Sequence, residues 1–245
     1  MSSRPSPARW ESFAAVAVLL LALALRLYHL DAQSLWNDEG TSVALAQRDL
    51  ATIARHASYD IHPPLYYVLL HFWVTGAGAG EFAVRALSAL EGVALVAGVW
   101  TLARRTAGRT VAPLAALLAA VAPFGVYFSQ EARMYVGVAL FGLLTTLACE
   151  RLLFGVADAA ERPTTPRFSW RVAYVVAGIA TIYSHYLGAT VLVAHNLVFL
   201  ARWFALPTRR WRALGGWITL QAAVALAYVP WLAVFIGGLW IPNLF

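Results

Sequence analysis

The sequence has 245 residues, of which 61% are hydrophobic and only 12% are charged. Soluble domains carry about twice that share of charged residues, so this composition, with a mean hydropathy of +0.67, excludes a soluble globular protein. The period-two alternation of lipid-facing β-barrel strands is not found, and the sequence therefore predicts an all-α membrane protein with several transmembrane helices.

The net charge of +6 comes from arginine alone, because the sequence contains no lysine. A basic protein can bind nucleic acid, but most of these arginines flank apolar segments on the side predicted to be cytoplasmic. Positive residues collect on that side of membrane proteins and bind anionic lipid there. We therefore expect the lipid bilayer as a partner and no nucleic acid. The single Cys149 excludes a disulfide framework and a cysteine-based metal site.

The first apolar segment, 12–30, is long enough to cross a bilayer. Arg4 and Arg9 precede it and predict a cytoplasmic N-terminus. The polar and acidic segment that follows, 31–80, is therefore expected to be a loop on the outer face of the membrane.

Two helices that do not cross the membrane are expected within this outer loop. Asn37 and Asp38 predict the start of an amphipathic helix, because apolar residues recur at helical spacing from Val43 to Ala57. Residues 65–76 are apolar and aromatic but too few to cross, since a crossing takes about 20 residues. We expect the first helix to lie along the membrane surface and the second to be an interfacial or re-entrant helix on the outer face.

The remainder of the chain predicts six further spans. Arginines near 104–109, 155–171 and 209–212 mark cytoplasmic segments, and they require the apolar stretch 172–206 to be a hairpin that turns at 184–188 on the outer face. The predicted spans are about 12–30, 82–103, 111–128, 134–154, 172–186, 188–206 and 213–236.

Four outer segments carry the ionisable side chains that chemistry requires: 31–80, 129–133, 184–188 and the C-terminal tail. Charged groups at membrane depth are costly and commonly line a cavity. We therefore expect these segments to gather around one site. Its candidate side chains are Asp38, Glu39, Asp60, His62, Glu131, Arg133 and His185.

The adjacent acids Asp38 and Glu39 allow two interpretations. Acids in the first turn stabilise a helix, typically by 0.3–1 kcal/mol, so the pair could serve as a helix cap. It could also supply a catalytic carboxylate. Both interpretations hold if capping orients one acid and leaves the other free.

The remaining candidates also have structural alternatives. His62 is either an exposed turn residue or a substrate or metal contact. Arg133 either extends to lipid head groups or binds a phosphate, and Glu131 would face another way on a helix. His185 is either an aromatic residue of the membrane interface or, with His62, a metal ligand. Glu91 lies in the middle of a predicted span, and the sequence assigns it no role.

Five motifs follow one another in the chain: WNDEG at 36–40, DIHPPLYY at 60–67, RALSAL at 85–90, SQEARMY at 129–135 and YSHY at 183–186. In this order they resemble the bacterial polyprenyl-phosphate-sugar-dependent glycosyltransferases with the GT-C fold. That group includes protein O-mannosyltransferases and lipid A aminoarabinose transferases. No motif is specific alone, so the resemblance depends on their common order.

The resemblance implies a GT-C module of seven spans, with juxtamembrane helices in the first outer loop. It implies transfer of a sugar from a polyprenyl-phosphate donor to a lipid, glycan or protein hydroxyl, with inversion, at the outer face of a bacterial plasma membrane. The implied catalytic pair is Asp38 and Glu39, with Asp38 as the general base. The implied substrate contacts are His62, Tyr66, Arg85, Glu131, Arg133, Tyr135 and His185, with Arg133 facing the phosphate. A divalent metal stays open as a cofactor, with His62 and His185 as its candidate ligands.

Family members are usually much longer than this chain, so we expect it to be the N-terminal module of a longer protein. Two other classes stay open. A multi-span transporter would place its ionisable groups near the middle of the membrane, whereas a non-catalytic membrane scaffold would need no site.

Overall fold

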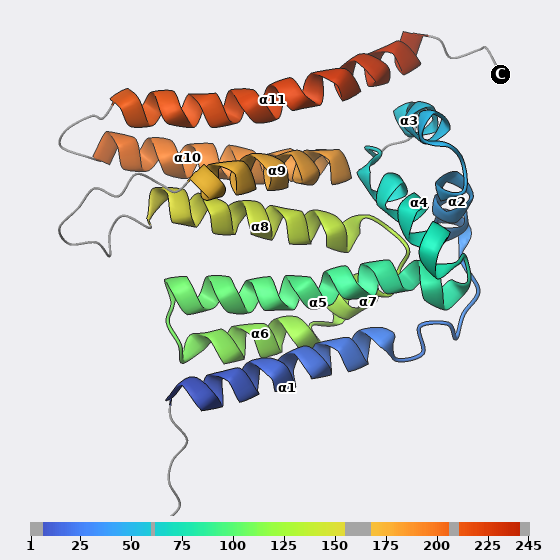
Figure 1. Cartoon of the computed structure of the whole chain (residues 1–245), viewed down its shortest axis with the longest axis horizontal. Helices are drawn as coiled ribbons and strands as arrows, with labels where there is room; N and C mark the ends of the chain where they lie inside the picture. The colour runs from blue at the N-terminus through green and yellow to red at the C-terminus, as the bar shows by residue number, and fades with distance from the viewer. Residues whose placement is uncertain (1–6, 60–61, 155–167, 206–210, 241–245) are drawn as a thin grey trace, which may run out of the picture. The chain divides into compact units, whose positions relative to one another are not determined.

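The structure is a computed structural model that describes residues 7–59, 62–154, 168–205 and 211–240. Regular structure within these residues is entirely helical (Figure 1), which confirms the predicted all-α membrane class. The helices are α1 (Pro7–Leu27), α2 (Asn37–Ala46), α3 (Leu50–Tyr59), α4 (Leu65–Ala77), α5 (Glu81–Thr106), α6 (Val111–Val121), α7 (Pro123–Ser129), α8 (Tyr135–Leu153), α9 (Phe168–Ser184), the 3₁₀-helix η1 (Tyr186–Gly188), α10 (Ala189–Ala205) and α11 (Trp211–Trp240).

Among the described residues, five helical segments are long and apolar enough to cross a membrane, and a sixth crossing results if α6 and α7 form one bent span. The five are Arg9–Leu27, Glu81–Thr106, Tyr135–Leu153, Tyr186–Ala205 and Trp211–Gly237. Helix α9 has 17 described residues and α4 has 13, whereas a crossing takes about 20. The chain is thus an integral membrane protein by length and composition, and the number of seven spans stays a prediction.

The segment predicted as one span, 111–128, is bent. Helices α6 and α7 meet at Ala122 at an angle of 58°. Pro123 starts α7, and proline lacks the N–H that would continue the hydrogen bonding of α6. The bend therefore has a local cause, a single proline, which the apolar composition of the segment does not indicate.

The amphipathic helix predicted from Asn37 onward is two helices, α2 and α3. The chain turns between them, and Asp49 then begins α3 by accepting hydrogen bonds from the Thr52 N–H (3.0 Å) and the Thr52 hydroxyl (2.6 Å). An aspartate that satisfies the free N–H groups of a helix start favours a new helix over continuation of the old one. The apolar residues Val43 and Ile53 are nevertheless buried, as their spacing indicates.

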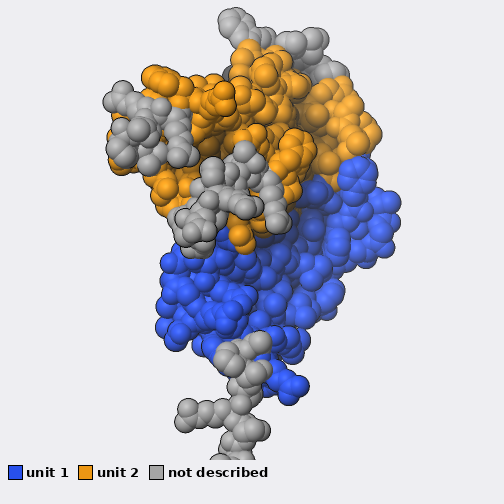
Figure 2. Space-filling model, turned by 60° about the vertical axis from the view of Figure 1, so that its left-hand side comes forward, with its two compact units in different colours: residues 1–48, 69–140 blue, residues 49–68, 141–245 orange. Residues whose placement is uncertain are grey.

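The chain divides into two compact units, coloured separately in Figure 2. Unit 1 comprises residues 1–48 and 69–140, and unit 2 comprises residues 49–68 and 141–245. In unit 1, α1, α5 and α6 pack against one another (Figure 1). Their core contains Ala22, Ala116 and Ala120, and such small side chains allow membrane helices to approach closely.

In unit 2, α11 packs against α9 and α3, and the core is aromatic. Phe199 and Trp217 stack face to face, with ring centroids 4.7 Å apart and planes inclined by 2°. Tyr174 contacts the same tryptophan at 5.3 Å. Unit 2 therefore holds its helices together with large rings, where unit 1 uses alanines.

Candidate active site

The site in unit 1 begins at the first turn of α2. Trp36 precedes the helix with an extended backbone (φ −81°, ψ 170°), and its N–H donates to the Glu39 carboxylate at 3.3 Å. This bond satisfies a backbone donor that a helix start leaves unpaired. Asp38 and Glu39 are also favoured by the helix dipole at this position.

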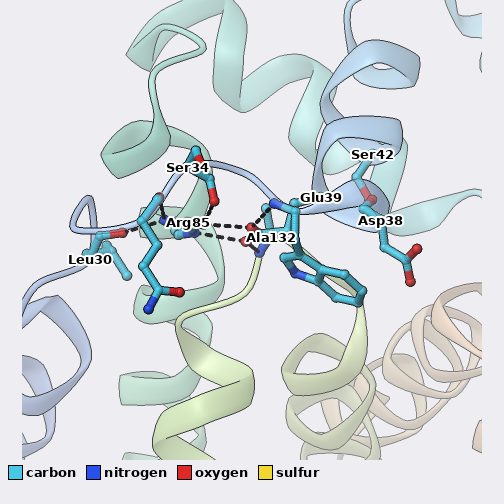
Figure 3. A network of polar contacts seen from close by, with 9 residues as sticks. Leu30, Ser34, Asp38, Glu39, Ser42, Arg85 and Ala132 are labelled. Atoms are coloured by element: carbon cyan, nitrogen blue, oxygen red, sulfur yellow. Dashed lines mark hydrogen bonds and ion pairs between the residues drawn. The ribbon is translucent and has the colours of Figure 1, made fainter.

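Glu39 is fully buried, and both of its carboxylate oxygens accept hydrogen bonds (Figure 3). Arg85 donates from Nε to Oε1 (2.8 Å) and from Nη2 to Oε2 (2.7 Å). The Ala132 N–H donates to Oε1 at 2.9 Å. Burial raises the pKa of Glu39, but the hydrogen bonds from Arg85, Ala132 and Trp36 and the charge of Arg85 outweigh it, so the pKa lies below its ordinary value.

Arg85, on α5, has no donor left for a ligand. A guanidinium has five N–H donors, and besides the two bonds to Glu39 it donates from Nη1 to the carbonyls of Leu30 (2.9 Å) and Gln33 (2.7 Å) and from Nη2 to that of Ser34 (3.3 Å). Arg85 thus fixes the segment between α1 and α2. This geometry does not favour the substrate contact implied by the resemblance.

Asp38 differs from its neighbour in being accessible. Its side chain is 41% exposed, against 1% for Glu39, and it points away from the Arg85 contacts in Figure 3. One carboxylate oxygen lies 3.7 Å from Nη2 of Arg133. One turn further along α2, the Ser42 hydroxyl donates to the Asp38 backbone carbonyl at 2.9 Å. Asp38 therefore combines solvent access with a fixed cationic neighbour.

Arg133 lies in the turn between α7 and α8 and is itself buried. Its Nη1 donates to the Ser42 hydroxyl (3.2 Å) and to the Asp38 carbonyl (3.4 Å), and its guanidinium lies 5.8 Å from the Tyr135 ring centroid. The Ser88 hydroxyl of α5 donates to the Arg133 carbonyl at 3.3 Å. The cation is thus held beside the exposed carboxylate from both its side chain and its backbone.

Glu131 is buried in the same turn. Burial raises its pKa, a hydrogen bond with Tyr127 acts in the opposite direction, and the charge of Glu39 adds to the increase. The pKa of Glu131 thus lies above its ordinary value, opposite to that of Glu39. Two carboxyl groups of one site are therefore placed in different electrostatic surroundings.

Three predicted site residues, His62, Tyr66 and His185, belong to unit 2. His62 and Tyr66 are buried, and the rings of His62 and His185 meet edge to face with centroids 5.2 Å apart. Nδ1 of His185 accepts the Leu187 N–H (3.1 Å) and caps η1, and burial lowers the pKa of this imidazole. Asp60 lies outside the described residues.

A metal site would need more ligands than this histidine pair. Within the residues that the structure describes, no group of three or more His, Cys, Asp or Glu side chains is arranged to hold an ion. His62 and His185 do lie together, as the metal hypothesis requires, but without a third described ligand they do not form a site by themselves.

Of the nine site residues implied by the resemblance, the structure brings six together in unit 1, namely Asp38, Glu39, Arg85, Glu131, Arg133 and Tyr135. Sequence reasoning missed Ser42 and Ser88, which hold Arg133. Ser42 had a detectable signal, since it stands four residues after Asp38 and so shares its helix face. Ser88 lies in the motif RALSAL at 85–90, but no spacing rule links it to Arg133, because the contact joins residues 45 positions apart.

The comparisons with known proteins concern the family of the chain and not the geometry of the site. A family profile described as dolichyl-phosphate-mannose-protein mannosyltransferase matches residues 61–234, which is more than half of the chain. The match begins after α2 and therefore does not include Asp38 and Glu39. A comparison with curated proteins found no match. The chain belongs to the dolichyl-phosphate-mannose-protein mannosyltransferase family and is a membrane glycosyltransferase.

Proposed function

We propose that this glycosyltransferase moves a sugar from a polyprenyl phosphate to an acceptor hydroxyl at the outer face of the membrane. The family supports a polyprenyl-phosphate donor. The apolar tail of such a donor partitions into the bilayer, so its sugar phosphate is presented at the membrane surface. The clustering of arginines at the opposite ends of the predicted spans supports the outer face.

The observation that carries the proposal is the pairing of an exposed carboxylate, Asp38, with a buried cation, Arg133, at 3.7 Å. The acceptor hydroxyl attacks the anomeric carbon, the bond from that carbon to the phosphate oxygen breaks, and the electron pair stays with the phosphate. Asp38 takes the hydroxyl proton. A positioned general base contributes about 10²–10⁴-fold to such a step. Attack opposite to the leaving group inverts the anomeric centre.

Arg133 supplies the positive charge that the departing lipid phosphate needs. Its side chain is fixed before the substrate binds, through Ser42 and the Asp38 carbonyl. Fixed charge directed at a developing anion is worth about 10²–10³-fold in rate. In this mechanism the leaving group is stabilised without reorganisation of the site.

Glu39 and Arg85 act as positioning residues rather than as groups that touch the substrate. Glu39 joins the start of α2, which carries Asp38, to the Ala132 N–H beside Arg133. Arg85 neutralises Glu39 with two of its donors and uses the other three to hold the segment between α1 and α2. The contacts of this buried carboxylate thus help to set the distance between Asp38 and Arg133.

The test is Asp38→Asn, with transfer of radiolabelled sugar from a polyprenyl-phosphate donor measured in membranes that contain the protein. Turnover is expected to fall by about 10²–10⁴-fold, with unchanged expression and thermal unfolding. Asp31→Asn is the matched control, because Asp31 is exposed in the same loop, and it should retain full turnover. Full turnover of Asp38→Asn would remove the proposed base.

Assays on the same membranes distinguish a glycosyltransferase from a transporter. Uptake of free sugar into sealed vesicles should be absent, and labelled product should require the lipid-linked donor. Donor-independent uptake that survives Asp38→Asn would favour transport instead.

A further inference from the structure

The bend between α6 and α7 leaves two backbone carbonyls without their helical donors. In a continuous helix the N–H of residue 123 would reach the Ala119 carbonyl, but this residue is Pro123 and has no N–H. The N–H of Phe124 would reach Ala120, but the 58° bend directs the chain elsewhere. Unpaired carbonyls inside a membrane protein are costly, so another donor is required.

Arg26, in the last turn of α1, donates to both of these carbonyls. Its Nη2 reaches Ala119 (3.4 Å) and its Nη1 reaches Ala120 (3.1 Å) and Ala22 of its own helix (3.2 Å). Arg26 is only 1% exposed, and no carboxylate among the described residues forms an ion pair with it. The partial negative charge at the C-terminal end of α6 provides the favourable interaction that a carboxylate would otherwise supply.

The same contact reaches the turn that carries Arg133. Nε of Arg26 donates to the Ser129 hydroxyl at 3.2 Å, and this serine ends α7. In return, the side-chain amide of Gln130 donates to the carbonyls that end α1, those of Leu25 (3.2 Å) and Tyr28 (2.9 Å) among them. The two helix ends cap one another, and the site turn begins at the next residue.

Gly92 of α5 provides the space for this contact. A Cβ built at Gly92 would lie 2.6 Å from Nε of Arg26 and still closer to the Ser129 hydroxyl. Neither neighbour can yield easily, because Arg26 is held by four hydrogen bonds and Ser129 also donates to the Gly125 carbonyl. Residue 92 therefore has to be glycine if the contact is to form.

We propose that Arg26 is a positioning residue for the reaction: it fixes Ser129 and Gln130, and thereby the place of Arg133 beside Asp38. The turn is then held at three points. Arg26 holds its start, Glu39 holds the Ala132 N–H and Ser88 holds the Arg133 carbonyl. The inference rests on the proposed function only for the role given to Arg133.

The first experiment measures the turn without reference to activity. Arg26→Gln keeps two donors but loses the planar fork, and Arg26→Lys keeps the charge; both are compared with the unaltered protein by hydrogen–deuterium exchange. Faster exchange is expected at residues 129–134, where the Ala132 N–H is otherwise protected by Glu39, with α9 unchanged and Arg26→Lys intermediate. Unchanged exchange in this turn would overturn the proposal, whatever the chain transfers.

The second experiment asks whether Arg26 acts through Arg133. Donor turnover is measured for Arg26→Gln, Arg133→Ala and the double variant. Misplacement of a catalytic group by about 1 Å can cost about 10²-fold, so Arg26→Gln should lower kcat by about 10- to 100-fold and add little to Arg133→Ala. An equal further loss in the Arg133→Ala background would show a merely structural role and overturn the proposal. Full turnover of Arg133→Ala alone would instead overturn the proposed function.

Gly92→Ala tests the same contact without altering a polar group. It should reproduce the faster exchange at residues 129–134 and the fall in kcat. Gly215→Ala is the matched control, since a Cβ there meets nothing within 4 Å, and it should change neither. Normal exchange and turnover in Gly92→Ala would contradict the proposed contact.

Discussion

The polar interiors of the two units are built from different chemistry. In unit 1 the buried polar groups around Glu39 are charged, and they join segments that are far apart in sequence: Glu39 to Arg85, 46 residues on, and to Ala132, 93 residues on. In unit 2 the corresponding network is neutral. Trp217 donates to Asn196 (2.8 Å), Asn196 to Gln221 (3.2 Å) and Gln221 to Tyr174 (3.0 Å).

The difference lies in what each network connects. The neutral bonds of unit 2 join α9, α10 and α11 to one another, which is the ordinary use of polar residues between membrane helices. The charged bonds around Glu39 in unit 1 fix the loop between α1 and α2, the start of α2 and the turn between α7 and α8. The exposed carboxylate of Asp38 lies next to these contacts. Ion pairs are expensive to bury, so the buried pair of Glu39 and Arg85 is accounted for by a site that needs exact placement.

The largest effect is expected from Arg85→Ala, which leaves Glu39 buried without its cation. Removing one partner of a buried ion pair costs about 3–5 kcal/mol of stability. Activity should also be lost, because Asp38 is no longer held in place. Thermal unfolding in detergent gives the stability, with Arg55→Ala as the control because Arg55 is exposed and, among the described residues, donates to Thr52. A stable and active Arg85→Ala protein would break the comparison between the units.

A smaller loss is expected from Gly137→Ala, between α8 and α5. A Cβ at Gly137 would lie 3.0 Å from Oε2 of Glu91 and 3.4 Å from Oε1, so the carboxyl group has to move. Overpacking of this kind costs about 1–3 kcal/mol, again measured by thermal unfolding. In the Glu91→Ala background the same change should cost much less, since the space is then open. Equal costs in both backgrounds would show that Glu91 does not fill this position.

Asn196→Ala should affect stability alone. It removes the acceptor of Trp217 and a donor to Gln221, and single hydrogen bonds between membrane helices are worth up to about 1–2 kcal/mol. Turnover per folded molecule should not change, because the network contacts no proposed site residue. Thr219→Ala in α11 is the control, since its hydroxyl bonds only within the helix. Loss of turnover without loss of stability would mean that unit 2 also carries a site.

The sequence alone predicts the components of the site better than their roles. The helix start at Asn37 and the importance of Asp38 and Glu39 follow from charge and apolar spacing. The division of labour between the two acids does not, because it depends on Arg85, and no spacing rule pairs residues 46 positions apart. Capping orients Glu39 and leaves Asp38 exposed, which is one of the alternatives that the pattern allows.

The two differences in the fold have local causes that composition conceals. Pro123 lies within an apolar run whose length favours a straight span, and Asp49 lies within an amphipathic pattern that continues across it. In both cases one residue controls the backbone hydrogen bonds, whereas the pattern of burial is unaffected. Arg26 was unpredictable for a related reason: its partners are carbonyls that exist only because the chain bends.

The smallest expected effect is a pH dependence that distinguishes Glu39 from Glu131. The pKa of Glu39 is lowered in the folded protein, so its contribution to stability is complete above the ordinary glutamate pKa of about 4.3 and is lost as the pH falls through the lowered value. The pKa of Glu131 is raised, so its contribution is complete below about 4.3 and is lost as the pH rises through the raised value.

Thermal unfolding measured against pH should therefore show two losses of stability. Below about 4.3 the loss comes from protonation of Glu39, and above about 4.3 it comes from ionisation of Glu131. Glu131→Gln, which mimics the protonated group, should remove the loss on the neutral side and leave the acid side unchanged. Asp31→Asn, in an exposed position, should leave the whole profile as it is. If Glu131→Gln instead made the loss at acid pH shallower and left the neutral side unchanged, Glu131 would be stabilised as a carboxylate, and two anions, Glu131 and Asp38, would act on Arg133 rather than one.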